Sequence, residues 1–260
     1  MNILDKIVTR KLEEVALAKQ KVSVAELEAK PNFNGQPLVF KDFLLDENRT
    51  GIISEFKRRS PSKGLINGTA DVAQITQAYN LAGASALSVL TDTDFFGGKA
   101  DDLFKARAVN QIPILRKDFM IDEYQILEAK AWGADIILLI ASILTPQQIN
   151  DFGKLAQSLG LSVLLEVHDL AELERSICPH LDAIGVNNRN LGDFTVNIQT
   201  SFDLVTQIPD EFLKISESAI DNPQVIKELK AVGYNGFLIG ENFMKTDNPG
   251  KAIKEFVVEL

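Results

Sequence analysis

Short apolar runs recur along the chain, and segments with helical periodicity lie between them. Each run is almost continuously hydrophobic, which is typical of parallel strands that are buried on both faces. The eight runs fall at residues 52–56, 86–90, 112–116, 135–141, 162–167, 183–187, 213–216 and 236–240. Amphipathic stretches between them predict helices at 72–82, 124–132, 146–159 and 222–232. The pattern therefore indicates strands and helices in regular alternation.

Glycine and proline residues mark the ends of these helices. Glycine favours the backbone that follows a last helical residue, and proline fits the first turn of a helix. The residues in these positions are Pro146, Pro223, Gly83, Gly133, Gly160 and Gly233. They support the helix boundaries that the apolar pattern predicts.

Eight strand–helix units in about 210 residues indicate an α/β fold, the (β/α)8 TIM barrel, which usually has about 250 residues. The 260 residues could instead form two smaller domains, but no linker or low-complexity tract divides them. We therefore expect one barrel domain spanning residues 1–260. A doubly wound open sheet is the alternative. Such a sheet more often has a glycine fingerprint after its first strand, where this chain has a basic loop.

Residues 1–45 precede the first predicted strand. Between Asp5 and Lys19, the apolar residues Ile7, Leu12 and Val15 roughly trace one face of a helix. We expect an N-terminal helical extension that packs on the barrel, at a position that the sequence does not give.

Composition and charge narrow the classes of function. The net charge of −9 argues against nucleic acid or an anionic membrane surface as a partner. The single cysteine, Cys178, excludes an internal disulfide and a thiolate metal cage, and His168 and His180 form no metal-binding pattern. The N-terminus lacks the apolar core of a signal peptide, and no apolar run approaches the roughly 20 residues that span a bilayer. We expect a cytoplasmic protein that binds neither a metal nor a membrane.

The first predicted strand ends in two charged residues. Glu55 and Lys57 are two positions apart, so they share one face of an extended strand. Charges on an interior strand are unusual unless that face opens on a site. The following loop adds Arg58, Arg59 and Lys63, which suit an anionic ligand. The alternative is a salt bridge with a purely structural role.

Other predicted strands also end in polar residues. Active sites of barrels lie at the carboxyl ends of the strands, and helix N-termini after the seventh and eighth strands commonly bind phosphate. The polar residues at these ends are Lys117, Glu166, Asn187, Arg189, Ser218 and Glu241. Each of them alone could be structural, but their gathering at one end of a barrel predicts an active site.

Several of these segments together resemble the indole-3-glycerol-phosphate synthase family, which forms the indole ring in tryptophan biosynthesis. The most specific is the segment from Glu55 to Gly64, which reads EFKRRSPSKG. The others follow in the family's order at residues 90–98, 116–119, 165–168, 186–191 and 216–218. The likeness covers most of the chain from about residue 40 onward.

The resemblance implies ring closure of 1-(2-carboxyphenylamino)-1-deoxyribulose 5-phosphate, with loss of carbon dioxide and water and without a cofactor or metal. It implies that Lys117 is the general acid that protonates the ketone and that Glu166 is the base of the later dehydration. Neighbouring cations would lower the pKa of Lys117 toward a useful value. Lys57 would bind the carboxylate or act as a second acid, and Glu55 would hold Lys57 in place.

The same resemblance implies a phosphorylated small molecule as the partner in binding. Asn187 and Arg189 would orient its carboxylate and hydroxyls, and Ser60 lies in a loop, residues 58–64, that we expect to close as a lid. Phe119 and Leu138 would line a slot for the aromatic ring. The implied phosphate site consists of Lys63, Ser218, Ala219, Gly240 and Glu241. The sequence does not give the oligomeric state: a monomer is compatible with it, and association with other enzymes of tryptophan biosynthesis is left open.

Two segments depart from the family pattern. Ala219 stands where the family usually has glycine, which would weaken phosphate binding if the backbone there has positive φ. The segment from Gly240 to Met244 is bulkier than usual.

Two other functions stay open: a Schiff-base aldolase with Lys117 as nucleophile, and a non-catalytic binding barrel. The sister enzyme phosphoribosylanthranilate isomerase needs a different acid–base pair.

Overall fold

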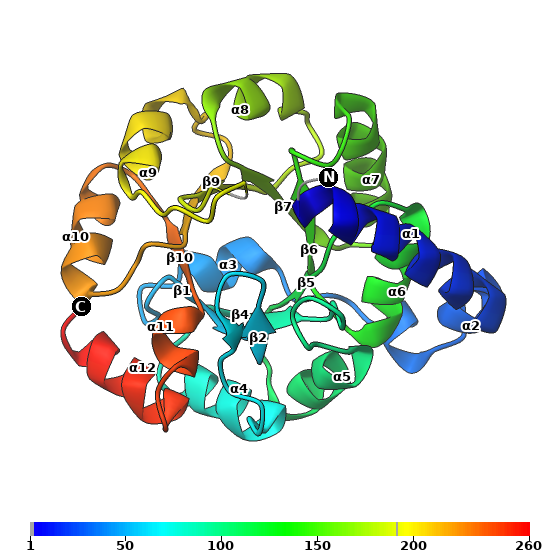
Figure 1. Ribbon diagram of the computed structural model, residues 1–260, viewed down its shortest axis with the longest axis horizontal. Coiled ribbons are helices and arrows are strands. Elements are labelled where there is room, and N and C mark those ends of the chain that lie inside the picture. Colours follow the sequence, from blue (N-terminus) through cyan, green and yellow to red (C-terminus); the bar gives the residue numbers. More distant parts are fainter. Residues whose placement is uncertain (1–2, 191) are drawn as a thin grey trace.

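Eight strands of the computed structural model, which describes residues 3–190 and 192–260, form a closed parallel barrel (Figure 1). Around the barrel they follow the order β1-β10-β9-β8-β7-β6-β5-β4. The strands are β1 (Ile52–Phe56), β4 (Ala86–Leu90), β5 (Ile114–Lys117), β6 (Ile136–Ile140), β7 (Ser162–Val167), β8 (Ala183–Asn187), β9 (Leu213–Glu217) and β10 (Gly236–Ile239). The predicted barrel is confirmed.

Helices surround most of the barrel on the outside, whereas α3 (Phe40–Leu44) lies within the ring of helices (Figure 1). The other helices are α1 (Ile3–Lys21), α2 (Val24–Glu28), η1 (Pro31–Asn34), α4 (Val72–Leu81), α5 (Ala100–Val109), α6 (Glu123–Trp132), α7 (Pro146–Ser158), α8 (Leu170–Ser176), α9 (Gln199–Leu204), η2 (Val205–Gln207), α10 (Pro223–Ala231), α11 (Glu241–Met244) and α12 (Pro249–Val258). The four predicted helices match α4, α6, α7 and α10, and the four glycines predicted past their ends all have positive φ. Within residues 3–190 and 192–260, no helix is long and apolar enough to cross a membrane.

Side chains along each strand alternate between the barrel interior and the surrounding helices. The interior cluster holds inward-facing apolar residues, among them Ile53, Leu115, Leu164 and Ile215. Strand residues two positions apart share a face, so the next inward position on these strands lies at the carboxyl end of the barrel. Those next positions are Glu55, Lys117, Glu166 and Glu217. The fold therefore brings four charged side chains to one end of the barrel.

Strand β9 runs one residue further than the apolar pattern predicts. It ends at Glu217, whose partners in register are Asn187 on β8 and Leu238 on β10. The apolar pattern stops at Ser216 because Glu217 is charged. Pairing with neighbouring strands on both sides nevertheless keeps Glu217 within the sheet and places it beside the predicted site.

The N-terminal extension places α1 beside the barrel mouth, next to α6 (Figure 1). The Tyr124 hydroxyl of α6 donates hydrogen bonds to the carbonyl oxygens of Ala18, at 3.2 Å, and Val22, at 2.7 Å. An ion pair of 2.7 Å joins Lys19 of α1 to Asp122. These contacts supply the position that the sequence alone does not give.

Candidate active site

A pocket opens at the carboxyl ends of the barrel strands, and every barrel strand contributes to its lining. Most of the sequence-predicted site residues line it: Glu55, Lys57, Ser60, Lys117, Phe119, Leu138, Glu166, Asn187, Arg189, Ser218, Ala219, Gly240 and Glu241. Side chains that the sequence reasoning missed also line it, namely Ile3, Leu4 and Ile7 of α1, together with Phe96, Phe194 and Glu217. The α1 residues show that the extension forms one wall of the pocket.

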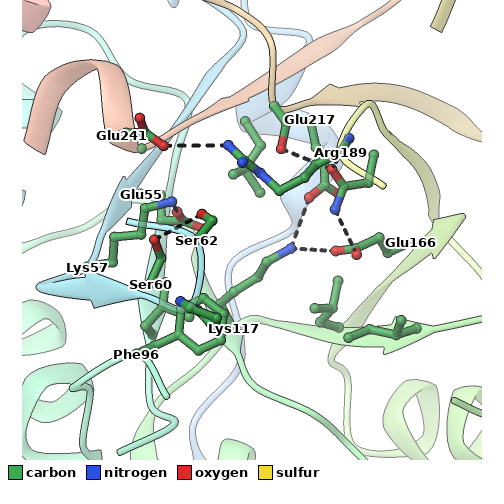
Figure 2. A pocket seen from close by; sticks show the side chains of 18 of the residues that line it. Glu55, Lys57, Ser60, Ser62, Phe96, Lys117, Glu166, Arg189, Glu217 and Glu241 are labelled. Carbon is green, nitrogen blue, oxygen red and sulfur yellow. Dashed lines mark hydrogen bonds and ion pairs between the residues drawn. The ribbon is translucent and has the colours of Figure 1, made fainter. Parts of the chain in front are cut away.

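Lys117 lies at the centre of the polar part of the pocket (Figure 2). Its Nζ is 2.7 Å from Glu166 Oε2 and 2.9 Å from Glu217 Oε2. Burial alone would lower the pKa of Lys117, but Glu166, Glu217 and Glu55 together raise it well above its usual value. The expectation that neighbouring cations lower this pKa is wrong, because the groups nearest to the ammonium are carboxylates. The surrounding carboxylates therefore hold Lys117 in its charged form.

Glu217 belongs to the segment 216–218 that resembles the family, but the sequence alone predicts no role for it. Its Oε2 contacts Lys117, whereas its Oε1 is buried without a hydrogen-bond partner among the described residues. A Cβ at Gly185 would collide with that Oε1, so the glycine makes room for the carboxylate. Burial raises the pKa of Glu217 to about 7, where Lys117 opposes the rise and Glu166 adds to it. Glu217 is therefore a second titratable group in contact with the central lysine.

The raised pKa of Glu217 predicts a stability difference that depends on pH. An ordinary glutamate pKa in the unfolded chain is about 4.3, so the native state holds this proton more tightly, and its stability falls as pH rises through about 7. Glu217→Gln removes this loss. We compare the free energy of unfolding of the variant with that of the unsubstituted protein at each pH. This difference should favour the variant by roughly 1–3 kcal/mol more at pH 8 than at pH 5.

Denaturant unfolding at the two pH values measures this difference. The exposed Glu211→Gln serves as the control and should show no such pH dependence. An equal effect of Glu217→Gln at pH 5 and pH 8 would contradict the raised pKa.

Glu166 is held from three sides. Its Oε2 contacts Lys117, and its Oε1 accepts a hydrogen bond of 3.0 Å from Asn187 Nδ2 and lies 3.4 Å from His168 Nε2. Burial alone would raise the pKa of Glu166, but Lys117 and His168 lower it far below its usual range. His168 also contacts Glu172 at 3.0 Å, and the two carboxylates raise the pKa of His168 to about 10 against the effect of burial. Glu166 is therefore ionised and fixed in orientation.

The Glu55–Lys57 pair is a real ion pair, and both of its members line the pocket (Figure 2). Lys57 Nζ lies 2.7 Å from Glu55 Oε1. A Cβ at Gly240 would collide with the Glu55 carboxylate, so this glycine provides space for Glu55. The pair is part of the site and not an isolated surface salt bridge.

The loop after β1 forms a small hairpin in which β2 (Arg59–Ser60) pairs with β3 (Gly64–Leu65). Ser60 and the two residues that follow it line the pocket. Arg58 does not serve as a free cation, since its guanidinium donates to Asp102 at 2.6 and 2.9 Å and lies over the Phe56 ring. Arg58 thus anchors the base of the hairpin.

Lys63 of the hairpin lies outside the pocket lining. Its side chain is 56% exposed, and its Nζ is 3.7 Å from Glu241 Oε1. Glu241 also faces Arg189, whose Nη2 is 3.5 Å from Glu241 Oε2. Lys63 therefore lies at the outer edge of the expected phosphate site, beside Glu241, and does not line the pocket.

The turn after β9 has the unusual backbone that a glycine would favour. Ser218 has φ of 64° and Ala219 has φ of 59°, and the Ser218 hydroxyl donates to Asn187 Oδ1 at 2.9 Å. The positive φ expected at this turn is thus present. The alanine adopts it at a cost, since a Cβ disfavours this region by about 1 kcal/mol.

Replacing this alanine by glycine should remove that cost. Ala219→Gly is expected to raise the free energy of unfolding by about 0.5–1 kcal/mol and to leave the turn intact. Ala231→Gly, at an exposed position of α10, is the control and should lower it by a similar amount, since glycine weakens a helix. Denaturant unfolding of both variants checks the prediction, and a loss of stability in Ala219→Gly would contradict it.

Comparisons with known proteins give the relatives of this chain. A family model described as indole-3-glycerol phosphate synthase matches residues 4–256. The chain is 46% identical over 256 residues to indole-3-glycerol phosphate synthase of Bacteroides thetaiotaomicron, covering 98% of each chain. It is 42% identical over 260 residues to the protein of the same name from Bordetella pertussis, covering 98% of this chain and 99% of that one.

Among solved structures, thiamine phosphate pyrophosphorylase from Pyrococcus furiosus has a TM-score of 0.60 at 16% identity, covering 82% of this chain and 96% of that chain. That likeness concerns the fold alone. The fold and pocket define a (β/α)8 barrel with a charged site at the carboxyl ends of its strands. The family match and the two relatives go further: the chain belongs to the indole-3-glycerol phosphate synthase family, which acts in tryptophan biosynthesis.

Proposed function

We propose that this protein closes the indole ring of 1-(2-carboxyphenylamino)-1-deoxyribulose 5-phosphate to give indole-3-glycerol phosphate, carbon dioxide and water, which makes it a carboxy-lyase. The observation that carries the proposal is Lys117, a buried ammonium held between Glu166 and Glu217 at the base of the pocket. This arrangement supplies a charged donor beside two acceptors, as the reaction requires.

The pocket has parts that match the three parts of this substrate. Phe119 and Leu138 are apolar and suit the aromatic ring, and Lys57 is a cation for its carboxylate. The turn at Ser218 and Ala219 presents small residues to the phosphate. Because the three regions surround Lys117, the substrate's ketone would lie near the ammonium.

Ring closure is the first chemical step. The ring carbon that bears the carboxylate attacks the ketone carbon, a carbon–carbon bond forms, and Lys117 donates its proton to the ketone oxygen. Carbon dioxide then leaves and its bonding electrons restore the aromatic ring. The carboxylates of Glu166 and Glu217 stabilise the ammonium before transfer. Glu217, whose pKa is raised to about 7, can return a proton to the amine afterwards when it is in its protonated form.

Dehydration is the second chemical step. The new hydroxyl leaves as water with a proton from Lys57, while ionised Glu166 removes the proton whose loss completes the indole. Asn187 holds Glu166 in orientation by its hydrogen bond of 3.0 Å, and Arg189 lies beside it to orient the substrate. Glu55 positions Lys57 through their ion pair. The hairpin that carries Ser60 would close over the bound substrate.

The raised pKa of Lys117 disfavours the Schiff-base alternative. A Schiff-base lysine attacks as the neutral amine, and the surrounding carboxylates hold Lys117 in the charged form. The pocket also keeps all the charged groups proposed for the reaction, Lys57, Lys117 and Glu166. A non-catalytic binding barrel would not need all of them.

We propose further that residues 1–260 form one domain, since α1 supplies part of the pocket wall and would leave it open if it folded apart.

An assay of the purified protein tests the function directly. Incubation with the carboxyphenylamino-deoxyribulose phosphate should produce indole absorbance and fluorescence, together with one carbon dioxide for each indole. Absence of indole at micromolar enzyme would refute the proposal. Indole formation after treatment with a metal chelator should be unchanged.

A further inference from the structure

Helix α1 carries a lysine, Lys11, whose side chain is buried. The Lys11 side chain is only 4% exposed, and its Nζ lies 2.9 Å from Asp92 Oδ2, 2.9 Å from Asp118 Oδ1 and 2.6 Å from Glu14 Oε2. Asp92 and Asp118 are themselves buried, and they follow strands β4 and β5. The ammonium therefore joins the N-terminal helix to two loops at the carboxyl end of the barrel.

Both aspartates also hold the backbone of pocket-lining aromatic residues. Asp92 Oδ1 accepts hydrogen bonds from the backbone N–H groups of Phe95, at 2.8 Å, and Phe96, at 3.2 Å. Asp118 Oδ1 accepts one from the backbone N–H of Phe119, at 2.8 Å. Phe96 and Phe119 line the pocket, and their ring centroids are 6.0 Å apart. Asp92 thus contacts Lys11 through Oδ2 and the aromatic backbone through Oδ1, whereas Asp118 makes both contacts through Oδ1.

The ammonium compensates the charge of both buried carboxylates. Burial alone would raise the pKa of Asp118, but Lys11 and Arg116 lower it to about 2. Among the described ion pairs, Lys11 is the one cation that contacts Asp92, so Asp92 would be left unpaired without it. Asp118 would still be paired with Arg116. An unpaired buried carboxylate takes up a proton or moves toward water, and either change alters its hydrogen bonds to the backbone.

We propose that Lys11 is a positioning residue that fixes the aromatic wall of the pocket, formed by Phe96 and Phe119, through Asp92 and Asp118. It touches neither the substrate nor the reacting atoms. The N-terminal helix thereby affects how well the pocket binds the ring end of its substrate. This role adds to its contribution to the pocket wall. This inference rests on the proposed function in so far as it takes this wall to be the slot for the aromatic ring.

The experiment compares two simple probes that report on the two ends of the pocket. One probe is 2-(methylamino)benzoate, which carries the ring and its carboxylate, and the other is inorganic phosphate. Binding of each is measured by calorimetry in the unsubstituted protein and in Lys11→Met. We expect Lys11→Met to weaken the ring probe about tenfold or more, because a charge-assisted network is lost, and to leave phosphate binding within about twofold.

The matched control is Lys19→Met, which removes another ion pair of α1, with Asp122, that reaches neither aromatic residue. It should leave both probes within about twofold. Equal weakening of both probes in Lys11→Met would show a general structural role and overturn the inference. Unchanged binding of the ring probe would overturn it as well.

A second variant covers the case in which Lys11→Met does not fold. Asp92→Asn removes one buried charge but keeps an oxygen for the Phe96 amide, so the double variant Lys11→Met/Asp92→Asn has one unpaired carboxylate fewer. The double variant is compared with Asp92→Asn alone: it should bind the ring probe less than about tenfold more weakly, and a loss of tenfold or more would overturn the coupling. If the unsubstituted protein forms no indole, the proposed function fails, while the probe measurements still decide the role of Lys11.

Discussion

Replacing Lys117 by alanine is expected to lower kcat for indole formation by about 10²- to 10⁴-fold, the usual contribution of a general acid. The ammonium is the only group in contact with both Glu166 and Glu217 among the described ion pairs, so no described neighbour can take over its proton transfer. Since ring closure precedes decarboxylation, release of carbon dioxide should fall in parallel with indole formation. Single-turnover kinetics with both products followed measures the effect.

Lys254→Met is the control for this substitution, because Lys254 is an exposed lysine of α12 that does not line the pocket. It should change kcat by less than about threefold. A Lys117→Ala variant that keeps the full rate would contradict the acid role. Borohydride treatment in the presence of substrate should give no adduct at Lys117, and a trapped adduct would favour the Schiff-base alternative.

Replacing Glu166 by glutamine is expected to lower kcat for indole formation by about 10²- to 10⁴-fold, but through a different step. The amide cannot remove a proton, so the dehydration fails while ring closure can still proceed. In a single turnover, carbon dioxide should therefore appear before indole, with the two amounts separated in time. In the unsubstituted protein they should appear together.

The control for this substitution is Glu174→Gln, an exposed glutamate of α8 in the same part of the barrel. It should leave both product curves unchanged. If carbon dioxide and indole slowed equally in Glu166→Gln, the carboxylate would act before decarboxylation, and its assignment as the dehydration base would be wrong.

The barrel follows from the sequence because buried parallel strands have a simple pattern. Each strand is covered on both faces, so it is apolar throughout, and glycines after the helices give the boundaries. The charged residues at the strand ends interrupt that pattern, and this interruption indicates where the site is. Glu166 and Asn187 could be located in this way because each directly follows an apolar strand residue.

The remaining features depend on which strands and helices are neighbours in space. Glu217 is charged and follows a strand like the others, but its importance comes from Lys117, 100 residues away in sequence. The direction of the Lys117 pKa shift likewise requires the identity of its neighbours. The wall formed by Ile7 and the buried position of Lys11 could not be predicted, because helical periodicity gives a face and not the surface that the face meets.

A crystal structure with 1-(2-carboxyphenylamino)-1-deoxyribitol 5-phosphate tests the central claim most directly, that Lys117 protonates a ketone held between a phosphate site and an aromatic slot. The reduced carbon of this compound cannot undergo ring closure, so the complex is stable. We predict phosphate at the Ser218–Ala219 turn, the ring against Phe119 and Leu138, and the hydroxyl that replaces the ketone within hydrogen-bond distance of Lys117 Nζ. A complex with the ring at the Ser218–Ala219 turn, or with that hydroxyl out of reach of Lys117, would contradict the account.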